Sequence, residues 1–234
     1  MASTVIVGDV HGCAAELEDL LGHQGFVEGR DRLVFVGDVI ARGPDPHGTL
    51  ALAHRLGARI ARGNHEHRLL EWRHRGKPLG ADHARLSEAL SPDEWRILEA
   101  TPLWVELPEH GLRVVHAGIP PAMAPDRAPV EALLRMRTID HRGLWSDEPD
   151  AGPLWGSRYA GPPHVIFGHN ARAEPQLHEW ATGIDTGCVY GGRLTAAVLA
   201  DGEPMPRGEA ARRVLCSVQA RRKYSPGKTG SRLT

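Results

Sequence analysis

Residues 4–12 read TVIVGDVHG, an apolar and mostly β-branched run that passes at once into glycine and aspartate. An apolar run of this length is typical of a strand that is buried on both faces of a sheet. Glycine after the strand allows a sharp turn, because it has no Cβ to clash. The same pattern returns at residues 33–38, LVFVGD, and at residues 164–169, HVIFGH. The chain therefore contains at least three expected strands that end in a polar side chain.

Two further apolar runs follow the same rule with small variations. The run at 58–61 leads to Gly63-Asn64, and the run at 112–115 leads to His116. Ligands of α/β proteins bind at the carboxyl ends of the strands, so these polar side chains are expected to converge on one place. The candidate ligands are Asp9, His11, Asp38, Asn64, His116 and His169.

The chemical mixture of these candidates indicates the kind of metal site. Carboxylate, imidazole and amide oxygen together suit Mn²⁺, Fe or Zn²⁺, whereas the lack of cysteine argues against a structural zinc site. Six ligands are too many for one catalytic ion that must keep open positions. They suit two ions that share a carboxylate, an arrangement that can clamp a phosphoryl group and activate water.

The rest of the chain predicts one domain with helices between the strands. Helices are expected over residues 14–21, 46–56 and 91–100, and residues 67–102 resemble a helical insertion without strands. No linker divides the chain. We expect the domain to cover residues 1–205, followed at 206–234 by a last strand and a basic C-terminal tail.

Composition supports a globular protein of ordinary charge. Of the 234 residues, 41% are apolar and 24% charged, which excludes wholesale disorder. No apolar run approaches the ~20 residues that span a bilayer, and three cysteines form no disulfide framework, so a cytoplasmic protein is expected. The net charge of −1 hides a tail with eight Lys and Arg against one acidic residue. That tail is expected to be either a solvated end or an attractor for a polyanionic substrate.

The motifs, taken in order, resemble the successive signature motifs of the phosphoprotein-phosphatase-type, calcineurin-like metallophosphatases. The matching segments are GDVHG at 8–12, GDVIARG at 37–43, GNHE at 63–66, HAG at 116–118 and GH at 168–169. The ordered set is much more specific than any one of its members. The resemblance implies an α/β (α+β) fold, an αββα sandwich with a dinuclear metal site at the top.

The resemblance also implies a role for each matched side chain. Asp9 and His11 are expected to bind the first ion, Asp38 to bridge, and Asn64, His116 and His169 to bind the second. His65 is expected to be the general acid that protonates the leaving oxygen. Arg42 matches the arginine that grips phosphate, and Arg158, after LWSD at 144–147 and WG at 155–156, is the candidate for a second one. Asn64 is also expected beside the substrate.

Ala41 departs from the protein-phosphatase version of the second motif, Gly-Asp-x-x-Asp-Arg-Gly, whose second aspartate orients the general acid. Alanine there resembles the symmetrical diadenosine tetraphosphate hydrolases, the ApaH-like branch, as does IDTGCVYGGRLT at 184–195. A departing phosphate, with a second pKa of about 6, needs little protonation. A serine or threonine alkoxide needs a well-aligned acid. We therefore hypothesise that Ala41 marks specificity for phosphoanhydrides, with a less strongly oriented His65.

The expected activity is hydrolysis of diadenosine tetraphosphate, or of related dinucleoside polyphosphates, to two ADP. Attack by a hydroxide held between two divalent ions is expected, with no covalent intermediate. Mn²⁺ is the first expectation for these ions, and Co²⁺, Fe or Zn²⁺ are the alternatives. Trp155, Tyr159 and Tyr190 are the candidates for stacking on adenine.

Two other functions compete with this expectation. One is a serine/threonine or dual-specificity protein phosphatase, or a polyphosphatase, on the same scaffold. The other is a non-catalytic nucleotide-binding sensor. A small nucleotide is the expected partner and a capped RNA end stays open, whereas no membrane or duplex nucleic acid is expected. The sequence does not fix the oligomeric state.

Overall fold

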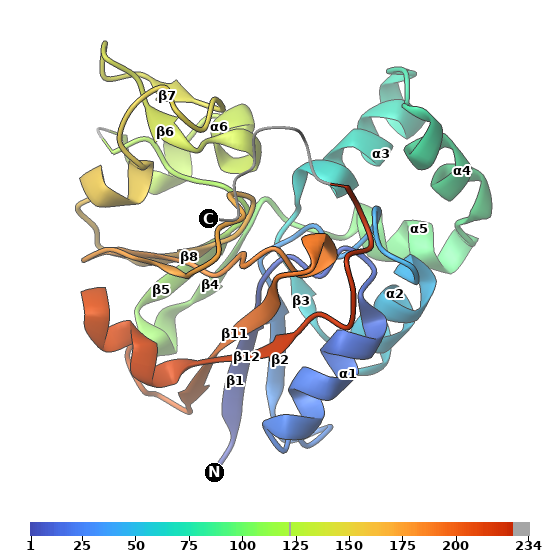
Figure 1. Cartoon of the computed structure of the whole chain (residues 1–234), viewed down its shortest axis with the longest axis horizontal. Helices are drawn as coiled ribbons and strands as arrows, with labels where there is room; N and C mark the ends of the chain where they lie inside the picture. The colour runs from blue at the N-terminus through green and yellow to red at the C-terminus, as the bar shows by residue number, and fades with distance from the viewer. Residues whose placement is uncertain (122, 227–234) are drawn as a thin grey trace.

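A computed structural model describes residues 1–121 and 123–226, and two five-stranded sheets form its centre (Figure 1). The strands are β1 (Ser3–Val7), β2 (Arg32–Phe35), β3 (Arg59–Ile60), β4 (Trp104–Leu107), β5 (Leu112–Val115), β6 (Thr138–Ile139), β7 (Trp145–Ser146), β8 (His164–Phe167), β9 (Gln176–Leu177), β10 (Ala181–Gly183), β11 (Arg193–Ala200) and β12 (Leu215–Gln219). The helices are α1 (Ala14–His23), α2 (Pro46–Arg55), α3 (Asn64–Arg75), α4 (Ala81–Ala89), α5 (Pro92–Glu99) and α6 (Val130–Arg135). The sheet orders are β12-β11-β1-β2-β3 and β4-β5-β8-β10-β9, with β6-β7 as a separate pair.

The strands that the apolar runs predict are present, and the short ones were missed. β1, β2, β5 and β8 lie within one residue of the predicted runs, and the run at 58–61 forms the two-residue strand β3. β6, β7, β9 and β10 have two or three residues each, too few for an alternating pattern to be recognised.

Alternation along the central strands shows why two sheets stack. In β1, Val5 and Val7 contact the cluster that includes Leu17 and Leu50 of α1 and α2, whereas Ile6 packs between the sheets with Ile166 of β8. Successive side chains of a strand point to opposite faces, so each face of this sheet has its own core.

The outer face of the second sheet has a third apolar cluster. Val165 and Phe167 of β8 pack there with Leu133 of α6 and with Trp155. Helices therefore cover the outer face of the first sheet, and α6 with its loops covers that of the second, as Figure 1 shows at the right and the upper left. The fold is the expected αββα sandwich.

Parallel pairing places the expected site at one edge of the sandwich. β1, β2 and β3 are mutually parallel, and β8 is parallel to both β5 and β10. The loops after β1, β2, β3, β5 and β8 therefore leave the sheets on the same side. These loops carry the side chains that the sequence marks as ligands.

The end of the chain folds back on α1. After β12, which pairs with β11, the backbone N–H of Arg221 donates a hydrogen bond of 2.9 Å to Glu16, and the Tyr224 hydroxyl donates one of 2.6 Å to the same carboxylate. Arg221 also pairs with Asp19 at 2.9 Å. Part of the basic tail is thus neutralised, and its residues 227–234 lie outside the described residues.

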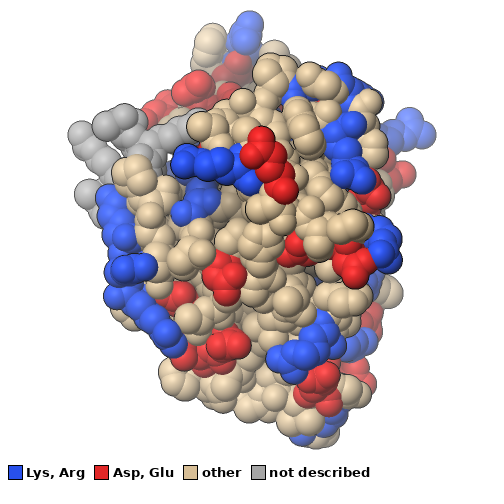
Figure 2. Space-filling view, turned by 90° about the vertical axis from the view of Figure 1, so that its right-hand side faces the viewer, with Lys and Arg blue, Asp and Glu red and all other residues tan. Residues whose placement is uncertain are grey.

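The surface over α1–α5 carries charges of both signs. Figure 2 shows Lys and Arg interspersed with Asp and Glu on this face rather than segregated from them. Within the described residues, no helix has the length and apolar character that a membrane crossing requires.

Candidate metal centre

The six candidate ligands converge at the strand ends, on the walls of one cavity. Asp9, His11, Asp38, Asn64 and His169 line this cavity of about 210 Å³, and the buried ring of His116 lies directly behind Asn64 and Asp38. A larger depression of about 370 Å³ beside α2 and α5 is mainly apolar and is lined by none of the six.

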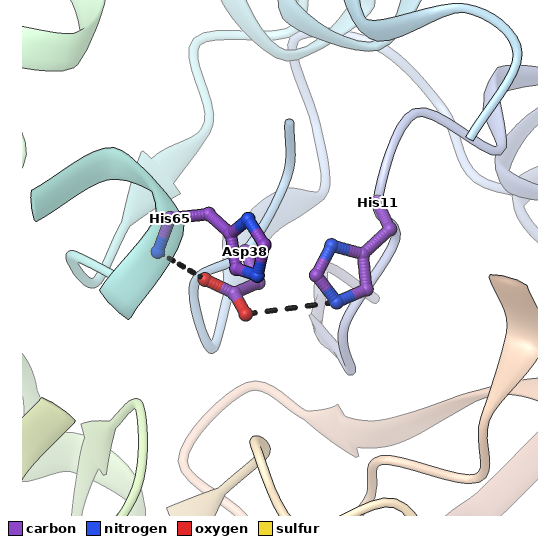
Figure 3. Close-up of side chains that lie close together, drawn as sticks. All are labelled: His11, Asp38 and His65. Atoms are coloured by element: carbon purple, nitrogen blue, oxygen red, sulfur yellow. Dashed lines mark hydrogen bonds and ion pairs between the residues drawn. The ribbon is translucent and has the colours of Figure 1, made fainter. Parts of the chain in front are cut away.

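The first group of possible ligand atoms comes from His11 and Asp38 in the loops after β1 and β2 and from His65 at the start of α3 (Figure 3). Nδ1 of His11 lies 3.1 Å from the carbonyl oxygen of Ile40, so that nitrogen carries the proton and donates it. Nε2 of His11 then turns a lone pair toward the carboxylates, 3.6 Å from Oδ2 of Asp38 and 4.0 Å from Oδ2 of Asp9.

The second group lies on the other side of Asp38. Nδ1 of His116 donates to the carbonyl of Val36 at 3.2 Å, and Nε2 of His169 donates to that of Arg135 at 3.1 Å. The remaining ring nitrogens therefore have lone pairs. They lie 3.0 and 2.9 Å from Oδ1 of Asn64, and Nε2 of His116 is also 3.4 Å from Oδ2 of Asp38.

These two groups fit bound cations. When the carboxylates are ionised, the facing atoms of each group are all hydrogen-bond acceptors, and they repel one another unless a cation lies between them. Burial also lowers the pKa of His11 and of His116 to about 3, which leaves both rings neutral and able to bind metal. A divalent ion satisfies such a set of converging nitrogen and oxygen lone pairs.

The buried carboxylates add a second argument for cations. Burial raises the pKa of Asp38 to about 7, and burial with the neighbouring charges of Asp185 and Asp38 raises that of Asp9 well above its ordinary value. Asp185, which the sequence did not single out, lines the same cavity, and burial raises its pKa to about 6. Three close carboxylates require positive charge to stay ionised at neutral pH.

The backbone that holds Asp38 is fixed by one carboxylate of α3. Glu66 accepts hydrogen bonds from the backbone N–H groups of Asp38 at 2.9 Å, Val39 at 3.0 Å and Gly63 at 2.8 Å. Asp38 itself has a left-handed φ of 48°, a conformation that costs energy for a non-glycine residue. A Cβ on Gly37 would lie 2.7 Å from the nitrogen of Gly63, so the two loops approach each other only as glycines.

His65 is positioned beside this centre by three contacts. Its backbone N–H donates to Oδ1 of Asp38 at 2.9 Å (Figure 3). Its Nε2 lies 3.1 Å from Nε of Arg42, and its Nδ1 lies 2.9 Å from Nε2 of His83 on α4. Although Ala41 offers no acceptor atom, the ring of His65 is contacted at both nitrogens, which differs from the expectation of a weakly oriented ring.

Among the described residues, four arginines line the cavity, and Arg158 is not one of them. Besides Arg42, which was expected, the lining holds Arg68, Arg135 and Arg137. Arg158 is exposed at the end of a 3₁₀ turn over Trp155–Arg158, whose Trp155 is anchored in the core. The prediction for Arg158 is thus not met by the geometry. Arg137 instead enters the cavity, where its Nη1 donates to Oδ1 of Asn170 at 3.0 Å.

The three aromatic candidates for stacking on adenine lie in different parts of the structure. Trp155 and Tyr159 are buried in the third apolar cluster, so neither ring is free to stack on a base. Tyr190 does line the cavity, and the guanidinium carbon of Arg42 lies 5.7 Å from the centre of its ring.

Some of the missed residues had a detectable signal. Arg68 lies four residues after Asn64, so on a helix the two occupy one face. Arg137 and His83 had none, because only the tertiary fold brings them to the cavity and to His65.

A family comparison and three similar proteins bear on this geometry. The model of the family described as calcineurin-like phosphoesterase matches residues 2–201. A protein of Chromohalobacter salexigens, named symmetrical bis(5'-nucleosyl)-tetraphosphatase, is 32% identical over 86% of this chain and 96% of its own. One of Oceanobacillus iheyensis, named asymmetrical bis(5'-nucleosyl)-tetraphosphatase PrpE, is 30% identical over 82% of this chain and 86% of its own.

A solved structure is similar to this chain over almost its whole length. It is described as the crystal structure of a candidate diadenosine tetraphosphatase, and it is 37% identical to this chain. The superposition has a TM-score of 0.80 and covers 93% of each chain.

Proposed function

The chain belongs to the calcineurin-like phosphoesterase family, and from that membership we propose that it is a metal-dependent hydrolase of dinucleoside tetraphosphates. Its proposed reaction is the symmetrical cleavage of diadenosine tetraphosphate to two ADP. The name of the Chromohalobacter relative supports this substrate and this bond, and the name of the Oceanobacillus relative supports the substrate with the other pattern of cleavage.

The observation that carries the proposal is the ring of four arginines around the ligand cluster. Arg42 and Arg68 come from the side of β2 and α3, and Arg135 and Arg137 from the end of α6 and the residues after it. A phosphomonoester offers one phosphate to such a site. A tetraphosphate offers a negative charge on each of its phosphates, and forked guanidinium groups match phosphate oxygens well.

Two groups of ligands are proposed to hold the two ions. Asp9, His11 and Asp38 would hold one, and Asp38, Asn64, His116 and His169 the other. When bound, divalent ions at such a site stabilise charge on phosphoryl oxygens and lower the pKa of water to generate a nucleophile. Mn²⁺ is proposed as the working ion, because the mixture of oxygen and nitrogen ligands without sulfur suits it.

The chain's own side chains would orient the phosphates and supply a proton. Phosphate oxygens are stronger acceptors for Arg42 than the neutral ring nitrogen it contacts now. Binding of substrate would therefore free Nε2 of His65, and the negative charge of the phosphates would favour protonation of this nitrogen from solvent, after which its N–H can donate to the leaving oxygen. Arg137, on the opposite wall, would stabilise charge on the transferring group.

Product analysis tests the proposal. We would supply the Mn²⁺-loaded protein, in separate reactions, with equal concentrations of diadenosine tetraphosphate, inorganic polyphosphate, a phosphothreonine peptide and p-nitrophenyl phosphate. The expected result is ADP as the sole nucleotide product, formed faster than any other product. ATP with AMP would show asymmetrical cleavage, and preference for the peptide or for polyphosphate would replace the proposed substrate.

A substitution of His65 distinguishes an enzyme from a nucleotide-binding sensor. In His65→Gln we expect turnover of diadenosine tetraphosphate to fall by roughly 10²- to 10⁴-fold, the usual contribution of a general acid. Binding of a non-hydrolysable analogue, measured by calorimetry, should change little. Equal, slow turnover in wild type and variant would favour the sensor.

A further inference from the structure

The ring of His65 is held by a chain of hydrogen bonds whose direction can be assigned. A guanidinium can only donate, so Nε of Arg42 donates to Nε2 of His65 over 3.1 Å. In the neutral ring the proton of His65 is therefore on Nδ1. That N–H points at Nε2 of His83, 2.9 Å away, which must accept it. The direction of donation is Arg42 to His65 to His83.

His83 is a buried residue whose position beside His65 is fixed by the packing of α4. It is 6% exposed, on the inward face of α4. Its ring lies nearly parallel to that of His65, with centroids 4.8 Å apart and planes inclined by 23°. The hydrogen bonds at Nδ1 and Nε2 hold the His65 ring at two points, so its rotation about χ2 is restricted.

The residue at the place where the resembling protein phosphatases carry an orienting aspartate is Ala41, which has no acceptor atom. We propose that His83 is the positioning residue for His65, and that α4 thereby supplies from the helical segment the orientation that the second motif lacks. This inference rests on the proposed function, since it assigns a role to His83 through the acid function of His65.

The acceptor's chemistry also bears on the substrate class. A carboxylate next to the acid histidine stabilises the charged ring strongly, as in other acid–base pairs of histidine and aspartate. A neutral imidazole acceptor orients the ring equally well and stabilises its charged form less. That arrangement suits a departing phosphate, which needs little protonation, better than an alkoxide.

Leaving-group dependence tests a positioning role. We would compare wild type, His83→Ala and His83→Gln, all loaded with Mn²⁺, on phenyl phosphate, p-nitrophenyl phosphate and diadenosine tetraphosphate. Oε1 of glutamine can accept where Nε2 of His83 accepts now. In His83→Ala we expect kcat on phenyl phosphate to fall roughly 10- to 100-fold, within the range of general acid catalysis. The losses on the two substrates with good leaving groups should be several-fold smaller, with KM unchanged throughout.

The glutamine variant and a surface control complete the design. His83→Gln should recover most of the lost kcat, and Glu88→Ala, an exposed change on the same helix, should behave as wild type. Losses of equal size on all three substrates, a rise in KM alone, or no recovery by glutamine would each overturn the inference. If His83→Ala does not fold, the comparison of His83→Gln with wild type still tests the inference. The glutamine variant must then show the same dependence of kcat on the leaving group as wild type. Failure of the proposed function is separate, since it appears as a wild-type protein that does not hydrolyse diadenosine tetraphosphate.

Discussion

The ligand cluster and the surrounding arginines face the same cavity, but the protein holds them in different ways. The ligands lie on strand-end loops with the left-handed backbone of His11, Asp38 and His169, and backbone groups orient their side chains. The arginines come from helices and connecting segments, and two of them, Arg42 and Arg137, are held through side chains, His65 and Asn170. We infer that the centre, formed by the six ligands, is held more firmly than the rim, formed by Arg42, Arg68, Arg135 and Arg137, because backbone contacts orient the ligands and side-chain contacts hold the arginines.

The largest expected effect comes from the centre. Asp38→Asn removes the one carboxylate that both ligand groups share. Activity on diadenosine tetraphosphate should fall at least ~10³-fold, because metal ions contribute several kcal/mol to the barrier. Asp147→Asn is the matched control, since that exposed carboxylate lines the same cavity without joining either group. Retention of activity within tenfold in Asp38→Asn would remove the distinction between centre and rim.

The rim should give a smaller effect that depends on which arginine is changed. Arg137→Ala should lower kcat on the order of 10²-fold, as removal of one donor to a developing charge does elsewhere. Arg137→Lys should recover part of it, because the charge stays while the forked geometry is lost. Arg158→Ala is the control and should stay within twofold of wild type, since that side chain is exposed and outside the cavity lining. A larger loss of kcat in Arg158→Ala than in Arg137→Ala would support the sequence prediction for Arg158 and refute the assignment of Arg137 to the cavity.

Removal of metal should destabilise the centre in a pH-dependent way. Burial raises the pKa of Asp38 from 3.8 to about 7, so the folded metal-free protein binds more protons than the unfolded chain between these values. Its stability therefore falls as the pH rises through that range, and the loss is complete above pH 7. Bound ions offset that loss. The rise in Tm on adding Mn²⁺ after chelation should be several degrees greater at pH 8 than at pH 6, measured by calorimetry.

The same experiment on Asp38→Asn is the control for this pH dependence. Asparagine does not titrate, so the difference between the two pH values should shrink markedly. An equal metal effect at both pH values in wild type would mean that the buried carboxylates are not what the ions stabilise.

The smallest effect is expected at Ala41, between centre and rim. Its φ of 67° suits aspartate better than most side chains, so Ala41→Asp should fold. The ratio of activity on phenyl phosphate, whose leaving group needs the acid, to that on diadenosine tetraphosphate should rise only a few-fold, because His83 already accepts from Nδ1 of His65. The double variant with His83→Ala should show the larger rise. An unchanged ratio in both would contradict the link between position 41 and the substrate class.

The same contrast explains what the sequence could and could not predict. Asp9, Asp38 and His169 each follow a glycine at the end of an apolar run, so a local pattern fixes the strand, the turn and the ligand together. The fold follows from the same runs, since alternation along β1 and β8 requires an apolar layer on both faces.

The arginines of the rim follow no such local pattern in the sequence, because contacts between distant segments bring them to the cavity. Arg137 and Arg158 lie in connected segments, where the backbone N–H of Trp155 donates to the carbonyl of Arg137 at 3.2 Å. Trp155 at the start of the same turn is buried, whereas Arg158 at its end is exposed. His83 reaches His65 across 18 residues through the packing of α4, and no spacing in the chain signals that contact.

Two ions that share Asp38 should be visible by anomalous diffraction at the manganese absorption edge, from crystals of wild-type protein grown with Mn²⁺. We expect two peaks, one beside Asp9, His11 and Asp38 and one beside Asp38, Asn64, His116 and His169. A single peak, or two peaks of which only one contacts Asp38, would contradict this expectation.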